Sequence, residues 1–94
     1  LELGVSPDRA LPGLLSARVL LGDPKGALDA AAKYTATDPA ARARSALWTG
    51  RAHAALNQPR EARAALQAAL QADPELHLAS VGLAALDAAG GDLA

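Results

Sequence analysis

Apolar positions recur with helical spacing in two segments of the chain. They stand at i, i+4 and i+7 in both: Ala27, Ala31 and Tyr34 in the first segment, and Ala62, Leu66 and Ala69 in the second. Positions three and four apart share one face of a helix, so each set predicts a single buried stripe. Ala27 and Ala62 are small and stand near a turn, where we expect paired helices to approach most closely.

Prolines divide the chain at a fixed interval. Pro24 and Pro59 are 35 positions apart, and so are Pro39 and Pro74. Proline suits the first position of a helix, because its missing N–H has no partner there in any case. An Asp before the Pro accepts hydrogen bonds from the free N–H groups of the first turn. The pattern predicts helices at about 11–21, 24–37, 39–56, 59–72 and 74–89.

Pro12 limits where the first helix starts. If the helix began at Pro7, the ring of Pro12 would clash with an earlier carbonyl at a cost of ~3 kcal/mol. We therefore expect regular helix from about Leu11, with residues 5–10 as a turn or a kinked lead-in. Gly90 and Gly91 are expected to end the last helix.

The short connections and the repeat period determine the predicted architecture. Turns of two or three residues make consecutive helices antiparallel. Self-similarity at about 35 residues is typical of arrays of helical hairpins. We predict one all-α module over residues 1–94, built of stacked antiparallel helical hairpins. Its expected core is Ala27, Ala31, Tyr34, Leu47, Leu56, Ala62, Leu66 and Ala69.

Residues 43–74 resemble the tetratricopeptide repeat (TPR) family. The matching positions are those of the family's small, Ala, large apolar, Ala and Pro residues: Gly50, Ala62, Leu66, Ala69 and Pro74. The resemblance extends over nearly the whole chain as about two and a half TPR-like repeats, at about 8–39, 40–74 and a partial 75–94. It implies a short right-handed α-solenoid in which the first helix of each hairpin lines a concave groove.

Composition supports helix and limits the means of stabilisation. Ala supplies most of the 51% hydrophobic fraction, and the only aromatic residues are Trp48 and Tyr34. Ala and Leu are strong helix formers, and β-branched residues are scarce, so strands are disfavoured. The 94 residues include no Cys, which excludes disulfides and thiolate metal sites. The chain also has no Met, so we expect it to be part of a longer protein.

Charge and motifs argue against several functional classes. The formal net charge is −1, so no overall field attracts nucleic acid or a membrane. No apolar run reaches the ~18 residues of a membrane span. His53 and His77 fall on different predicted helices without a carboxylate cluster, and no nucleophile or phosphate-loop motif is present. We expect neither an enzyme nor a metal or cofactor site. The Ala, Arg, Leu and Gly bias suggests a bacterial, GC-rich genome.

The predicted helix 39–56 carries the candidate binding residues. Arg44, Trp48 and Arg51 share one face at i, i+4 and i+7, and the helix has no acidic residue. Trp and Arg are enriched among binding hot spots. The candidate partner-binding residues are Arg44, Leu47, Trp48, Arg51 and Ala55, with Ser16 and Leu20 from the first repeat. The resemblance to the TPR family implies that the groove is also lined by Arg9 and Val19 in the first repeat, and by Val81 and Ala85 in the third. The alternative is that Trp48 is buried between hairpins and the arginines form a solvated face.

The predicted helix 74–89 has more apolar surface than one packed face can cover. Its candidate self-association residues are Leu78, Val81, Leu83 and Leu86. The leading hypothesis is a scaffold that binds an acidic or amphipathic peptide or helix of a partner protein. The Lys and Asn pairing by which chaperone-binding TPR domains hold a C-terminal carboxylate is not matched. The alternatives are a homo-oligomerisation module and an RNA-binding repeat, and net acidity argues against the latter. The compartment is not indicated.

Overall fold

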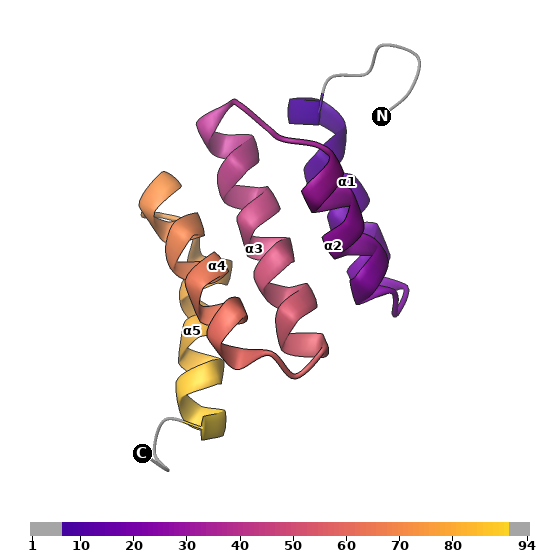
Figure 1. The fold of residues 1–94 in the computed structure, drawn as a ribbon. Coiled ribbons are helices and arrows are strands. Elements are labelled where there is room, and N and C mark those ends of the chain that lie inside the picture. The colour runs from indigo at the N-terminus through magenta and orange to yellow at the C-terminus, as the bar shows by residue number, and fades with distance from the viewer. Residues whose placement is uncertain (1–6, 91–94) are drawn as a thin grey trace.

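The computed structural model describes residues 7–90, which are all-helical (Figure 1). Five helices cover this part of the chain: α1 (Pro7–Leu20), α2 (Pro24–Lys33), α3 (Pro39–Ala55), α4 (Pro59–Ala72) and α5 (His77–Gly90). Only turns and short connections separate them, and residues 7–90 contain no strand. The prediction of an all-α chain is confirmed.

The helices are arranged around α3 (Figure 1). Each helix runs antiparallel to the next, with α1 and α2 on one side of α3, and α4 and α5 on the other. Both α1 and α2 pack against α3, and α3 packs extensively against α4. The last helix, α5, packs on α4 and touches α3 only sparsely.

Aspartate caps begin α2 and α3. Oδ1 of Asp23 accepts a hydrogen bond from the Gly26 backbone N–H at 3.0 Å, and Oδ2 of Asp38 accepts one from Ala41 at 3.2 Å. The following residue is Pro in both cases, so the missing donor falls where a helix has no acceptor for it. The sequence prediction of cap and helix start is confirmed at these two positions.

The same turn ends α1 and α3, one repeat period apart. Gly22 has a φ of 82° and Asn57 a φ of 60°, both in the left-handed region. The N–H of the next residue donates to the carbonyl five positions earlier, at 2.8 Å after Gly22 and at 2.9 Å after Asn57. This bond defines the Schellman motif, which satisfies carbonyls that a helix end leaves free. Two hairpins thus turn by the same local geometry.

The expected start of the first helix near Leu11 is wrong. α1 begins at Pro7 and contains Pro12. The hydrogen bond that Pro12 removes would reach only the first turn of the helix, and Pro7 itself favours helix initiation there. Leu11 and Leu15 are 2% and 0% exposed, so packing holds the rest of the helix in place.

The second helix ends at Lys33, earlier than the predicted residue 37. Tyr34 is extended, with φ −126° and ψ 143°, and directs the chain across to α3. Ala36 in this connection is 5% exposed and belongs to the core. The chain therefore buries Ala36 in the connection to α3, where the sequence predicted a further turn of helix.

The last helix begins at His77, not at the predicted residue 74. Asp73 is the extended residue after α4, and its Oδ1 accepts a hydrogen bond from the Glu75 N–H at 3.1 Å. The Asp73 side chain thus closes a tight turn and does not cap a helix at Pro74. Asp73-Pro74 and Asp38-Pro39 are the same dipeptide with two different outcomes.

The core consists of two clusters on either side of α3. The first joins α1, α2 and α3: Leu11, Leu15, Ala27, Ala36, Ala41 and Ala52. The second joins α3, α4 and α5: Leu47, Leu66, Ala69 and Ala79. Of the predicted core residues, Ala27, Leu47, Ala62, Leu66 and Ala69 are buried, whereas Ala31, Tyr34 and Leu56 are only half-buried.

Candidate functional site

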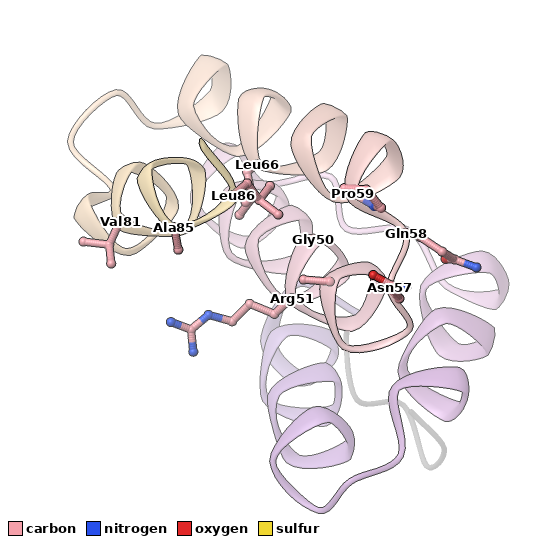
Figure 2. Close-up of a pocket in the computed structure, with 11 residues that line it drawn as sticks. Gly50, Arg51, Asn57, Gln58, Pro59, Leu66, Val81, Ala85 and Leu86 are labelled. Atoms are coloured by element: carbon pink, nitrogen blue, oxygen red, sulfur yellow. The ribbon is translucent and has the colours of Figure 1, made fainter. Parts of the chain in front are cut away.

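A groove of about 570 Å³ lies between α3 and α5, and α4 contributes to its floor (Figure 2). One wall comes from α3 through Gly50, Arg51 and Ala54. The opposite wall comes from α5 through Val81 and Ala85. The turn from α3 to α4 closes one end. The groove exists because α5 packs on α4 but diverges from α3.

Leu66 of α4 forms the floor of the groove, together with Leu86 (Figure 2). Leu66 is 2% exposed and is contacted from both walls at glycines. A Cβ placed on Gly50 would lie 2.8 Å from Leu66 Cγ, and a Cβ on Gly82 would lie 3.0 Å from Leu66 Cδ1. A side chain at Gly50 would force Leu66 to move, and one at Gly82 would crowd it, so the two glycines allow Leu66 to fill the space between α3 and α5.

Arg51 is the charged group at the mouth of the groove. Its guanidinium carbon lies 5.0 Å from the centroid of the Trp48 ring, a cation–π arrangement. The spacing of these residues by three positions on α3 places both side chains on one face. Trp48 is half-buried and packs against the first core cluster. It therefore supports Arg51 and does not line the groove itself.

Polar groups of the α3–α4 turn lie at the closed end. Asn57, Gln58 and Pro59 line the groove there. Nδ1 of His53 lies 2.7 Å from Oε1 of Gln58, so the tautomer with a hydrogen on Nδ1 donates to this oxygen. Gln58 makes no side-chain hydrogen bond to the start of α4, because its amide oxygen is engaged by His53.

Comparison of the chain with models of known families, with curated proteins and with solved structures returned no match. Within residues 7–90, no group of three His, Asp or Glu side chains is placed to hold a metal ion. None of the described helices combines the length and apolarity needed to cross a bilayer.

The structure brings together only some of the predicted binding residues. Arg51, Val81 and Ala85 line one groove, as expected for residues on neighbouring helices. Leu47 was expected to contact a partner, and this is wrong: it is 1% exposed and lies in the second core cluster. It packs there with Leu66, Ala69 and Ala79.

The remaining predicted binding residues lie outside the groove. Arg44 and Ala55 are exposed on α3 but do not line it. Ser16 donates from Oγ to the Gly13 carbonyl at 2.9 Å, a local bond within α1. Leu20 is 72% exposed at the end of α1. None of the described residues of α1 and α2 thus lines this groove.

The predicted self-association residues fall into two pairs. Leu78 and Val81 are 48% and 59% exposed. Leu83 and Leu86 are half-buried and pack against the second core cluster, and Leu86 also lines the groove. Their role in self-association stays a prediction.

Sequence reasoning missed the floor and the closed end of the groove. Leu66 was predicted to be core, and Asn57-Gln58-Pro59 was predicted only to be a turn. A signal was present in Gly82, because glycine inside a helix costs up to ~1 kcal/mol relative to Ala and usually marks a close approach. Which neighbour approaches Gly82 depends on the placement of α5.

Proposed function

We propose that the chain is a TPR-like module of stacked helical hairpins, forming a short right-handed α-solenoid. The repeated local geometry supports this proposal. Ala27 and Ala62 stand one period apart and are both 0% exposed. Gly22 and Asn57 stand one period apart and form the same helix-ending turn. These two pairs of positions thus have the same structural role in each period.

The proposed function is to bind a peptide or helical segment of a partner protein in the groove between α3 and α5. The observation that carries this proposal is an open groove with an apolar floor and one charged group at its mouth. Its volume falls in the range of ~300–1,000 Å³ that is typical of ligand sites. Amphipathic segments bind such grooves by placing their apolar face inside.

A binding role accounts for the lining better than a catalytic one. The described lining residues supply one guanidinium and two side-chain amides, with the remainder apolar or glycine. They include no nucleophile and no group suited to act as a general base near neutral pH. We therefore propose that the module is not an enzyme.

The experiment is a peptide selection against the folded chain, with the groove filled in a matched variant. Ala54 and Ala85 are exposed alanines that line the groove, whereas Ala64 and Ala68 are exposed alanines of α4 that do not. Peptides from a displayed random library are tested on Ala54→Gln/Ala85→Gln and on Ala64→Gln/Ala68→Gln. Loss of a well-placed contact costs about tenfold or more in affinity.

Only the groove variant should lose binding, because only its two glutamines replace residues that line the groove. Both variants add the same two helix-favouring side chains, so they should not differ in helix propensity. Circular dichroism and thermal melting verify that both remain folded. Equal binding to the two variants would mean that the selected peptides use another surface, and the proposed function would be rejected.

Self-association is the second candidate, because Leu78 and Val81 leave apolar surface on α5 exposed. Leu78 lies outside the groove, so a substitution at this position tests self-association without changing the groove lining. If copies associate through this face, sedimentation should detect dimers at tens of micromolar, and Leu78→Glu should give monomers of unchanged helicity. A wild-type chain that stays monomeric would exclude this candidate.

A further inference from the structure

We infer that the segment bound in the groove carries a carboxylate next to its apolar anchor, and that Arg51 selects it. This inference rests on the proposed function and specifies the chemistry of the partner. The apolar side chain would contact the floor at Leu66 and Leu86. The neighbouring Asp or Glu would reach the guanidinium at the mouth.

Arg51 has no carboxylate partner among the residues that the structure describes, 7–90. Among the described residues that line the groove, it is the only charged one. The ion pairs of residues 7–90 are Arg18 with Asp23, and Arg63 with Asp87. Arg51 takes part in neither, although it stands at the mouth of an apolar groove.

The two walls of the groove offer Arg51 no acidic partner. α3 contains no acidic residue, and the one acidic residue of α5 is Asp87. Asp87 is held by Arg63 of α4, whose Nη2 lies 2.6 Å from its Oδ1. Neither wall therefore offers a carboxylate to Arg51, and an incoming one meets no acidic neighbour to repel it.

Arg51 is oriented before any partner binds. Stacking on Trp48 at 5.0 Å restrains a side chain that would otherwise sample many rotamers. A guanidinium restrained in this way loses less entropy when it pairs with a carboxylate, and its planar fork suits both oxygens. Figure 2 shows Arg51 extending from α3 at the mouth of the groove, and Val81 and Ala85 on the opposite wall.

These features favour an acidic peptide over a nucleic acid. Binding to a phosphate backbone depends on several cationic contacts, each of which adds to its salt dependence. The groove has a single cation above an apolar floor, and the chain has a formal net charge of −1. One charge beside an apolar anchor suits a single Asp or Glu.

The test compares the peptides selected by three proteins: wild type, Arg51→Glu and Arg60→Glu. Arg60 is an exposed arginine of α4 that does not line the groove, so its reversal is a matched control. The wild-type and Arg60→Glu pools should contain Asp or Glu beside an apolar residue. The Arg51→Glu pool should contain Lys or Arg at that position.

Affinities measured for one wild-type peptide make the test quantitative. Arg51→Gln should weaken binding roughly two- to fivefold, as for a solvent-exposed ion pair. Arg51→Glu should weaken it by about tenfold, because it adds repulsion. Replacing the peptide's Asp or Glu by Lys should restore binding to Arg51→Glu. Added salt should weaken binding to wild type more than to Arg51→Gln.

The outcomes separate this inference from the proposed function. If all three pools share the same peptides without acidic enrichment, yet those peptides lose binding to Ala54→Gln/Ala85→Gln, the groove binds but Arg51 does not select, and the inference is wrong. If the chain binds a single-stranded oligonucleotide more tightly than any peptide, and Arg51→Glu abolishes it, the acidic-peptide inference is overturned. If the groove variant leaves peptide binding unchanged, the proposed function itself fails.

Discussion

The helices on the two sides of α3 pack against it differently, because their side chains differ in size. On one side, α3 packs against both α1 and α2, and large residues fill the junction. Leu11 and Leu15 of α1 are 2% and 0% exposed there. On the other side, α5 packs on α4 but only sparsely on α3, and a groove of about 570 Å³ opens.

Side-chain size explains the difference. The groove wall of α5 is made by Val81, Gly82 and Ala85, which leave space where α1 places leucines at its own junction. Gly50 and Gly82 let Leu66 fill the bottom of that space. A junction lined by large residues becomes core, and one lined by small residues over a leucine becomes a binding groove.

The largest expected effect comes from removing the floor of the groove between α3 and α5. Leu66→Ala deletes a side chain that is 2% exposed and is contacted from α3 and α5. We expect the free energy of unfolding to fall by about 3 kcal/mol, from lost burial and the cavity left behind. Urea denaturation measures the change. Leu20→Ala is the control, since Leu20 is 72% exposed and its loss should cost less than ~0.5 kcal/mol.

A pair of glycines tests how closely α3 approaches α4. The Cβ of Gly50→Ala would lie 2.8 Å from Leu66 Cγ and 3.2 Å from the Ala62 carbonyl oxygen. Overpacking of roughly 1–3 kcal/mol should outweigh the helix propensity gained, for a net loss of about 1 kcal/mol. Gly13→Ala in α1 meets nothing within 4 Å and should stabilise by up to ~1 kcal/mol. Thermal melts of opposite sign are expected, and equal signs would contradict the close contact at Gly50.

The core beside α3 contains a buried hydroxyl whose removal should stabilise the fold. Oγ of Ser45 is buried without a hydrogen-bond partner among the described residues, and Ser45 is 9% exposed. Ser45→Ala should raise the free energy of unfolding by about 1 kcal/mol, because the hydroxyl was desolvated without compensation. Ser80→Ala, at an exposed position of α5, should change it by less than ~0.5 kcal/mol. A destabilised Ser45→Ala in urea titrations would mean that this hydroxyl has a partner.

The smallest effect compares the two hairpin turns. Asn57 occupies the left-handed position at φ 60° that Gly22 occupies at φ 82°. Glycine pays no Cβ penalty there, so Asn57→Gly should stabilise by about 0.5 kcal/mol, and Gly22→Asn should destabilise by a similar amount. Differential scanning calorimetry resolves the two shifts. Shifts of the same sign would mean that the two turns are not equivalent.

Local chemistry was enough to predict most of the helical framework. Proline positions, Asp caps and apolar spacing involve residues within a few positions of each other, so the sequence indicated all five helices and the starts of α2, α3 and α4. The same spacing placed Arg51 beside Trp48 on one face of α3. Arg51, Val81 and Ala85 were predicted groove residues and line one groove.

What the sequence alone determined, then, is where helices form and which residues share a face. Tertiary structure decided which face is covered: Leu47 is buried and Leu83 is half-buried, although their spacing was equally compatible with a partner surface. It also decided that Ala36 is buried where another helical turn was expected, and that α5 diverges from α3 above Leu66. The burial of a residue depends on neighbours that are distant in sequence, and helical periodicity does not predict how closely those neighbours approach.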